Sequence, residues 1–329
     1  MILTKQALLQ NFNQAIETAI QNLDVHQLKP KGLYEPAGYL MNLGGKRIRP
    51  ALVLAAYSLF KDDFENAVPQ ALAVELFHNF TLAHDDIMDQ APYRRGKATI
   101  HTKWNVNTGI LSGDLIMIKA YEHLVNCPTE QLPEIFKVFN TTAIRVCEGQ
   151  QFDMDFETSE NVSIDDYINM ISLKTAALLD GSLRIGAIRA NASSKEVDFI
   201  GNFGMNLGIA FQLQDDILDA YGDPEKFGKQ VGGDIIANKK TYLLLSALSL
   251  AKGETQIKLQ NLLKQTSNTE EKVKNVLSIY NQINIKELAL QKMNDYYEAS
   301  LDNLNKIEAS EEVKEPLFKI LASLRVREI

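Results

Sequence analysis

The amino-acid sequence predicts an all-α fold, and three features of the chain support this. Proline is absent from residues 134–223 and 225–315, which permits long helices because proline interrupts a helix interior. Apolar residues recur at steps of three and four over long segments, as in amphipathic helices. The alternating pattern of half-buried strands is nearly absent. No Ser/Pro-rich linker interrupts the 329 residues, so we expect one domain, 1–329.

The periodicity predicts individual helices in order along the chain. Residues 8–23 show a single apolar face, which predicts a surface helix. Residues 68–88 are apolar around most of the helix circumference, as are residues 196–220, so we expect both helices to be central. Glycine, proline and other turn-forming residues indicate loops. The expected loops are 29–38, 44–49, 90–99, 126–128 and 222–233.

Composition excludes several classes of protein. The chain carries 34 Lys and Arg against 42 Asp and Glu, a net charge of −8, which argues against a general binder of nucleic acid or anionic membranes. No apolar run approaches the ~20 residues of a membrane span, and no signal-peptide pattern is present. We therefore expect a cytoplasmic protein. Cys127 and Cys147 form no CxxC motif, and we expect both to be buried, reduced thiols.

Two copies of one carboxylate motif are the most informative feature of the sequence. Residues 85–89 and 215–219 both read Asp-Asp-Ile-x-Asp, and each ends a strongly apolar segment. On a helix, the first and last aspartates of such a motif share a face with the second close by. Three carboxylates so close together are unfavourable unless a cation neutralises them.

The chemistry of these carboxylates favours Mg²⁺, since oxygen ligands without His or Cys suit a hard cation that shares its shell with phosphate oxygens. The alternative is a solvated acidic helix end, which the apolar neighbours of both motifs disfavour. If the two motifs face each other, they form a polar, metal-lined mouth over an apolar shaft. Such a pocket suits a diphosphate that carries a hydrocarbon tail.

Basic residues gather in the segments near both motifs. Arginine grips phosphate through two parallel hydrogen bonds, and lysine acts as a point charge. A single basic cluster is typically a solvated surface feature, but these surround the carboxylate motifs in sequence. The clusters are Lys46 to Arg49 after a diglycine, Arg94 to Lys97, Lys174, Lys229, and Lys239 with Lys240.

With these elements in order, the sequence resembles the trans-isoprenyl diphosphate synthases, also called polyprenyl synthetases. The resemblance runs over roughly residues 40 to 245. The matching elements are Gly-Gly-Lys-Arg-Ile-Arg-Pro at 44–50, Glu75-Leu-Phe-His78, 85–89, Arg94-Arg95-Gly96, Gly113-Asp114, Gly149-Gln150 with Asp153, Lys174-Thr175, Phe211-Gln212, 215–219, Gly228-Lys229 and Gly232-Gly233-Asp234 with Lys239 and Thr241. The family implies one large helical bundle around a central apolar cavity, and a homodimer.

The resemblance also implies a role for each matching residue. The metal ligands are Asp85, Asp86, Asp89, Asp215, Asp216 and Asp219, which would hold three Mg²⁺ on the allylic diphosphate. We rank Asp85, Asp89 and Asp215 first as direct ligands. The contacts to the allylic diphosphate are Arg94, Lys174, Lys229 and Lys239. The contacts to isopentenyl diphosphate are Lys46, Arg49, His78 and Arg95. The catalytic residues are Lys174, Thr175 and Gln212. Of these, Thr175 and Gln212 would place backbone or side-chain dipoles near the developing carbocation.

The implied reaction is head-to-tail prenyl transfer from an allylic diphosphate to isopentenyl diphosphate. Phe80 and Phe77 lie five and eight residues before Asp85, about one and two helical turns below the metal site. In the family, a large ring at the first of these positions acts as a floor for the growing chain. We therefore expect a short product, geranylgeranyl (C20) or farnesyl (C15) diphosphate.

Three other interpretations stay open. A class I terpene cyclase also uses Asp-Asp-x-x-Asp on an all-α fold, but is not expected to carry a second copy or the 44–50 loop. A non-catalytic subunit of a two-component synthase typically loses aspartates from one motif, and both are complete here. A helical scaffold with acidic ends is the third. The residues left with structural roles are His84, His101, Trp104, Cys127 and Cys147.

Overall fold

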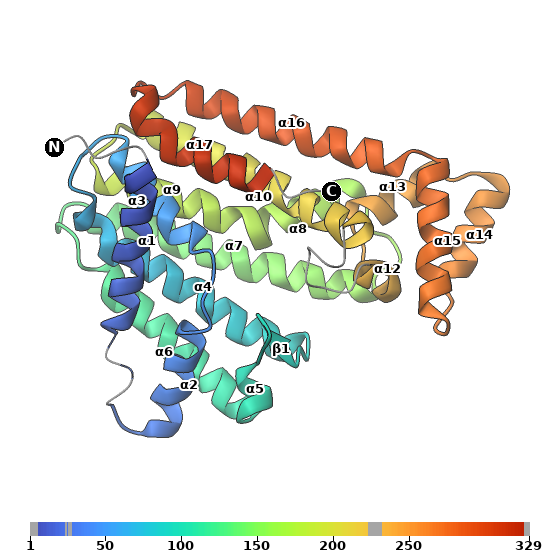
Figure 1. The fold of residues 1–329 in the computed structure, drawn as a ribbon, viewed down its shortest axis with the longest axis horizontal. Helices are drawn as coiled ribbons and strands as arrows, with labels where there is room; N and C mark the ends of the chain where they lie inside the picture. Colours follow the sequence, from blue (N-terminus) through green and yellow to red (C-terminus); the bar gives the residue numbers. More distant parts are fainter. Residues whose placement is uncertain (1–5, 24, 26–27, 223–231, 326–329) are drawn as a thin grey trace. The chain divides into compact units, whose positions relative to one another are not determined.

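The computed structural model describes residues 6–23, 25, 28–222 and 232–325, and over these residues the protein is predominantly helical (Figure 1). The all-α prediction is confirmed. The chain divides into two compact units. Unit 1 comprises Met1–Asn140, Gly181–Ile200 and Glu308–Phe318, and unit 2 comprises Thr141–Asp180, Gly201–Ile307 and Lys319–Ile329. That 1–329 forms one functional domain stays a prediction.

The helices fall into three sets by unit. Unit 1 holds α1 (Gln6–Gln21), α2 (Lys31–Met41), α3 (Ile48–Ser58), η1 (Phe64–Ala67), α4 (Val68–Met88), the strands β1 (Tyr93–Arg94) and β2 (Lys97–Ala98), α5 (Ile100–Lys103) and α6 (Val106–Leu124). Unit 2 holds α8 (Ile164–Ile171), η2 (Ser172–Ala176), α12 (Gly233–Ala237), α13 (Tyr242–Leu250), α14 (Gly253–Leu263), α15 (Thr269–Gln282) and α16 (Ile285–Asn305). The helices that contribute residues to both are α7 (Leu132–Thr158), α9 (Ala177–Arg189), α10 (Ser194–Tyr221) and α17 (Glu311–Arg325).

In unit 1, α4 is the central helix, as its all-round apolar sequence predicts. Most of its first half is buried, and α6 runs beside it (Figure 1). Gly109 and Gly113, one turn apart on α6, allow the two helices to approach. A Cβ on Gly109 would lie 2.8 Å from Ile87 Cδ1, and one on Gly113 would lie 2.6 Å from His84 Nε2. This close packing fixes the end of α4, where the first aspartate motif lies.

In unit 2, a π-helical turn interrupts the path from α8 to α9. This turn, η2, contains Lys174 and Thr175. Two glycines let neighbouring helices reach its backbone. A Cβ on Gly149 of α7 would lie 2.2 Å from Lys174 N, and one on Gly208 of α10 would lie 2.4 Å from Ala176 Cα. Turns of this kind within α-helices are frequent at functional sites.

Three loop predictions need adjustment. The loop expected at 29–38 is wrong, because α2 begins at Lys31 and continues through Pro36. The loop at 90–99 contains the hairpin of β1 and β2, in which Arg94 pairs with Lys97. Residues 223–231 of the loop expected at 222–233 lie outside the described residues. The predicted helices at 8–23, 68–88 and 196–220 are confirmed as α1, α4 and α10.

The cysteine prediction is wrong in one respect. Both thiols are free, but Cys147 is exposed on α7 and Cys127 is half-buried after α6. Residue type favours burial of a free cysteine, whereas the position of each side chain on its helix or turn decides it. Among the described helices, none combines the length and the apolar character that a membrane crossing requires.

Candidate active site

The first aspartate motif occupies the C-terminal turn of α4. Asp85 is half-buried, Asp86 is 2% exposed, and Asp89 is the exposed residue that caps the helix. Arg94 of β1 holds the buried member of the motif. Its Nε and Nη2 atoms both lie 2.7 Å from Asp86 Oδ1, and Nη2 is 3.5 Å from Asp85 Oδ2. Burial raises the pKa of Asp86, although Arg94 acts in the opposite direction.

The β1–β2 hairpin sends its two arginines to different places. The turn between the strands is made by Arg95 and Gly96, with φ values of 52° and 73°. Arg94 is directed to the aspartate motif, whereas the Arg95 guanidinium lies against Gly45. A Cβ on Gly45 would come within 2.8 Å of Arg95 Nη1, so the diglycine of the 44–50 loop makes room for this arginine.

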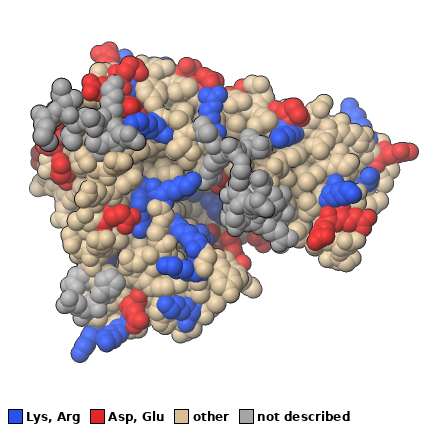
Figure 2. Space-filling view, in the orientation of Figure 1, with Lys and Arg blue, Asp and Glu red and all other residues tan. Residues whose placement is uncertain are grey.

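The residues predicted to bind isopentenyl diphosphate gather within unit 1. Arg49 Nη1 lies 3.3 Å from His78 Nε2, and Arg95 packs on Gly45, next to the exposed Lys46. Figure 2 shows Lys and Arg side chains grouped over the part of unit 1 that holds α4 and β1. The structure therefore brings this predicted cationic set together from three separate segments.

His78 is a neutral member of this cationic set. Its burial, followed by the charges of Arg49, Arg95 and other arginines, lowers the pKa of His78 well below its ordinary value. With Arg49 as the donor to Nε2, the imidazole proton belongs on Nδ1. A neutral imidazole avoids one further positive charge among guanidinium groups.

Arg47, in the middle of the same loop, has a different role. It is 5% exposed, and its Nη1 and Nε atoms bind Glu75 and Glu17 at 2.5 and 2.8 Å. It also donates to the Met41 carbonyl. The backbone at Arg47 is left-handed, with φ 48°, and its side chain is buried although the adjacent Lys46 is exposed. Arg47 anchors the loop to α1 and α4.

The second aspartate motif lies near the C-terminal end of α10, in unit 2. Asp215 and Asp219 are half-buried, and Asp216 is 5% exposed. Asp219 fixes the start of α12: its Oδ2 accepts from Asp234 N at 2.9 Å, and its carbonyl accepts from Gly232 N at 2.6 Å. The motif therefore organises the backbone that follows residues 223–231.

Asp216 is held by two protein donors. The Tyr167 hydroxyl donates to Oδ2, and Gln212 Nε2 donates to Oδ1 at 3.2 Å. Burial and the nearby Asp234 raise the pKa of Asp216 to about 7, although both donors act in the opposite direction. Gln212 in turn accepts from Thr175 Oγ1 at 3.1 Å. Two predicted catalytic residues thus belong to one hydrogen-bonded group.

The predicted lysines of unit 2 converge on one carboxylate. Lys174 Nζ lies 2.6 Å from Asp153 Oδ2, and Lys239 Nζ lies 3.8 Å from the same oxygen. Lys229 lies outside the described residues. Asp153 therefore places two ammonium groups side by side, an arrangement suited to a phosphate that bears more than one negative charge.

The site residues suit a divalent cation. Their donor groups are carboxylate oxygens, which hard cations prefer. Both motifs lie in the last turns of long helices, where the helix dipole favours positive charge. Among the described residues, no group of three or more His, Cys, Asp and Glu side chains is already close enough to hold a metal.

The two predicted floor residues belong to a chain of aromatic contacts in unit 1. The Phe77 and Phe80 ring centroids are 5.8 Å apart, and Phe77 is 1% exposed. Phe80 also contacts the His84 ring at 4.7 Å, and Phe77 contacts Phe139 of α7 at 5.4 Å. His84 thus has the structural position that the sequence suggests, bonded to the Ile110 carbonyl of α6.

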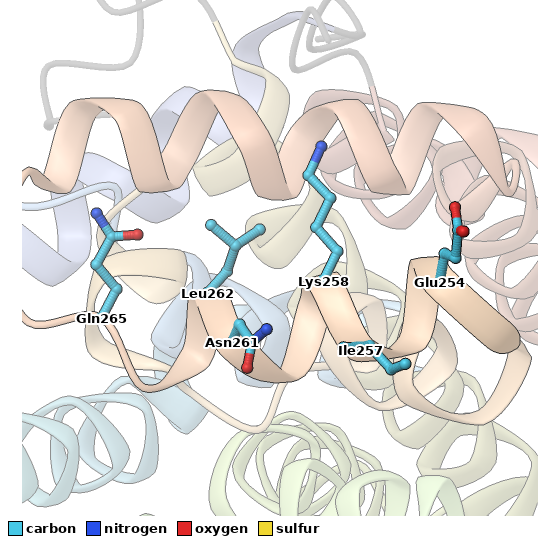
Figure 3. A pocket seen from close by; sticks show the side chains of 6 residues that line it. All are labelled: Glu254, Ile257, Lys258, Asn261, Leu262 and Gln265. Atoms are coloured by element: carbon cyan, nitrogen blue, oxygen red, sulfur yellow. The ribbon is translucent and has the colours of Figure 1, made fainter.

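A separate shallow pocket of about 360 Å³ lies on α14, shown in Figure 3. It contains none of the predicted site residues. Its lining side chains are Glu254, Ile257, Lys258, Asn261, Leu262 and Gln265. This mixture offers neither paired carboxylates nor clustered cations, so the aspartate motifs define the candidate active site.

Comparison with known proteins gives the family of this chain. Residues 30–280 match the polyprenyl synthetase family. The chain belongs to this family. The short chain isoprenyl diphosphate synthase of Methanocaldococcus jannaschii is 37% identical over 280 residues, covering 85% of this chain and 83% of that protein. The geranylgeranyl diphosphate synthase of Sulfolobus acidocaldarius is 36% identical over 299 residues, covering 90% of each.

Solved structures of polyprenyl synthetases share the whole fold. A geranylgeranyl pyrophosphate synthase superposes with a TM-score of 0.90 at 41% identity, covering 98% of both chains. A polyprenyl synthase from Caulobacter crescentus, complexed with calcium and isoprenyl diphosphate, gives 0.85 at 27% identity and covers 98% of this chain and 97% of that one. The protein is therefore a prenyl diphosphate synthase, a trans-prenyltransferase, and its family uses divalent metals.

Sequence reasoning missed three polar features of this synthase. They are the anchoring of Arg47 by Glu17 and Glu75, the bridging position of Asp153, and the contact of Tyr167 with Asp216. Tyr167 lies seven residues before Lys174, which is two helical turns. That spacing was available as a signal, but η2 changes the helical register between the two residues.

Proposed function

We propose that this synthase condenses isopentenyl diphosphate with an allylic diphosphate, head to tail, to a C20 prenyl diphosphate. The single observation that carries the proposal is the separation of cationic groups. Arg94 is bound to the first aspartate motif, whereas Arg49 and Arg95 surround the neutral His78. One arginine thus accompanies the metal-binding carboxylates, and the other two suit a diphosphate bound without metal.

In this proposal, the cations of each set bind one substrate. Lys46, Arg49, His78 and Arg95 hold isopentenyl diphosphate with its double bond in line with the allylic carbon. Arg94, Lys174 and Lys239, with Lys229, hold the allylic diphosphate. Mg²⁺ bound by the six motif aspartates, three ions in all, would neutralise the negative charge that develops on the leaving diphosphate.

Thr175 and Gln212 act on the allylic group, where positive charge develops. Their oxygen atoms stabilise positive charge on the allylic carbon once the C–O bond breaks. The double bond of isopentenyl diphosphate then attacks this carbon, and the new cation loses a proton to the departing diphosphate. No side-chain base is required, and water must be excluded because it would capture the cation.

Product length is the finer part of the proposal. Phe80, backed by the buried Phe77, forms the floor that stops the chain at C20. The names of the relatives indicate products of different lengths. One from Natronomonas pharaonis, 35% identical over 237 residues and covering 67% of this chain and 70% of that protein, is a geranylfarnesyl (C25) diphosphate synthase. The C15 and C25 products are therefore the alternatives that an assay must separate.

We also propose a homodimer, supported by the outer face of α6. Leu111 and Ile118 lie seven residues apart on this helix and are 58% and 59% exposed, and the exposed Val125 directly follows its last residue. Gly109 and Gly113 of the same helix pack against α4. An apolar stripe opposite a packed face is typical of an interface, and the same stripe on a second copy of the chain would give it an apolar partner.

The test is a product assay. The purified protein is incubated with Mg²⁺, isopentenyl diphosphate and either dimethylallyl, geranyl or farnesyl diphosphate, and the dephosphorylated products are separated by chromatography. We expect C20 alcohol from each primer. Diphosphate release without elongation would instead indicate a cyclase, and absence of turnover would indicate a non-catalytic subunit. A C15 or C25 product would retain the reaction and reject the proposed length.

A further inference from the structure

Four residues of unit 2 form a hydrogen-bonded relay that begins in the protein interior. Tyr167 of α8 is 1% exposed, and its hydroxyl contacts the 5% exposed Asp216. Asp216 accepts from Gln212 one turn earlier on α10, and Gln212 accepts from Thr175 in the π-helical turn. The relay therefore connects a buried tyrosine to a half-buried hydroxyl in the proposed catalytic group.

The hydrogen bonds of this relay point toward Asp216 from both sides. Asp216 accepts from both neighbours, from the Tyr167 hydroxyl at Oδ2 and from Gln212 Nε2 at Oδ1. The amide nitrogen of Gln212 must face Asp216, and its carbonyl oxygen must then face Thr175. A hydroxyl has one proton, and Thr175 uses it toward Gln212. What the Thr175 oxygen can offer to any other group is a lone pair.

We propose that Tyr167 is a positioning residue for prenyl transfer. Through Asp216 and Gln212, it keeps the lone pairs of Thr175 Oγ1, and not the proton, directed at the allylic carbocation. This rests on the proposed function, in which Thr175 and Gln212 border the carbocation. Loss of the Tyr167 hydroxyl leaves Asp216 with one protein donor, so the carboxylate rotates and the Gln212 amide loses its fixed orientation. A hydroxyl proton turned toward a cation would raise the barrier.

The primary test compares two conservative variants. Tyr167→Phe keeps the ring and removes the hydroxyl. Its matched control is Tyr242→Phe, since Tyr242 is 5% exposed in the same unit and its hydroxyl contacts Ser246 instead. We expect kcat to fall by about tenfold to a hundredfold in Tyr167→Phe, because misplaced positioning groups cost factors of this size, with unchanged KM values, and to stay unchanged in Tyr242→Phe. An unchanged kcat in Tyr167→Phe, or an equal loss in both variants, overturns the inference.

A double-mutant cycle locates the effect. Residues that act through one another give non-additive effects, so Tyr167→Phe should cost little in a Thr175→Val background. If Tyr167→Phe instead lowers kcat by the same factor in both backgrounds, Tyr167 does not act through Thr175. Gln212→Met removes the amide that links Asp216 to Thr175. We expect the same loss of kcat as in Tyr167→Phe. This second variant keeps the inference testable if Tyr167→Phe does not fold, because an unchanged kcat would contradict it.

A binding measurement separates the relay from the metal site. Calorimetry with Mg²⁺ and inorganic pyrophosphate should show a change in affinity in Tyr167→Phe that is much smaller than the loss of kcat, because Asp215 and Asp219 are not bonded to Tyr167. A loss of affinity as large as the loss of kcat, with kcat restored at high Mg²⁺, would mean that Tyr167 acts by supporting a metal ligand and would overturn the relay. Failure of the unmodified protein to elongate any primer would reject the proposed function itself, whereas normal elongation with an unaffected Tyr167→Phe rejects this inference alone.

Discussion

Lys174 Nζ donates a hydrogen bond of 2.6 Å to Asp153 Oδ2, joining the π-helical turn to α7. Both side chains are less than one third exposed, at 25% and 18%. Burial by itself raises the pKa of Asp153, but Lys239 and Lys174 outweigh burial and hold this pKa below its ordinary value. The ion pair therefore stabilises the fold while it places Lys174.

Replacing Asp153 should weaken the fold in a pH-dependent manner. A carboxyl with a lowered pKa contributes stability above pH 3.8, its unfolded-state value, and loses it as the pH falls through the folded-state pKa. We expect Asp153→Asn to reduce the free energy of unfolding by about 1–3 kcal/mol at pH 7, with the difference shrinking below pH 4. Urea unfolding across this range measures it.

The control for this variant is an exposed ion pair. Lys119 and Glu122 lie 2.6 Å apart, but Glu122 is 56% exposed. Glu122→Gln should change the free energy of unfolding by less than about 1 kcal/mol. If the two substitutions change the free energy of unfolding equally, the Asp153 ion pair stabilises the fold no more than an exposed one.

Gly149 should not tolerate a side chain. A Cβ there would lie 2.2 Å from Lys174 N, and a backbone atom cannot rotate away as a flexible side chain does. We expect Gly149→Ala to displace the π-helical turn and to lower kcat at least about tenfold, since small displacements of positioning groups cost large factors in rate. Steady-state kinetics and thermal unfolding measure both effects.

Gly32 supplies the matched comparison. A Cβ on Gly32, in the first turn of α2, meets nothing within 4 Å. Gly32→Ala should leave kcat unchanged and should not lower the melting temperature, because alanine favours the helix more than glycine does. Full activity in Gly149→Ala would refute the role assigned to the close approach.

His78 should stay neutral well into the acidic range in the substrate-free protein. Burial and four arginines lower the pKa of His78, so its contribution to stability is present above pH 6.5 and is lost as the pH falls. NMR of ¹³C-labelled histidine should show no titration of His78 near pH 6.5. Addition of isopentenyl diphosphate should raise its pKa, because the bound dianion offsets the arginine charges. A midpoint of 6.5 in the free protein would contradict the described environment.

Phe80 should control product length. Phe80→Ala removes the ring between Phe77 and His84 and should shift the main product by at least one C5 unit, as chromatography of the dephosphorylated alcohols would show. Phe136→Ala is the control, since Phe136 is an exposed aromatic on α7, 40% accessible. An unchanged chain length in Phe80→Ala would reject Phe80 as the floor.

The α6 stripe should mediate dimer formation. Leu111→Asp combined with Ile118→Asp would bury two unpaired charges in an apolar interface, and sedimentation should then detect monomers. Ile257→Asp on α14, equally exposed at 60%, should leave the oligomeric state unchanged. A monomeric unmodified protein at micromolar concentration would rule out this dimer.

The sequence by itself determined the fold class, the two aspartate motifs and the family. The prolines and helical spacing give the long helices, and the repeated Asp-Asp-Ile-x-Asp at 85–89 and 215–219 predicts a divalent cation. These features are local, since periodicity, helix ends and carboxylate spacing need no tertiary information. The ordered motifs between residues 40 and 245 add the cationic residues in the same way.

Tertiary structure decided which polar residues are buried and which partners they bind. The sequence presents Asp215 and Asp216 as equivalent, yet Asp216 is the buried one that receives Tyr167. Likewise Lys46 and Arg47 are adjacent, but Arg47 is enclosed by Glu17 and Glu75. Burial and pairing depend on helices that are distant in sequence, such as α8 against α10. The register change in η2 is decided by the close approach of Gly149 and Gly208, which no local pattern predicts.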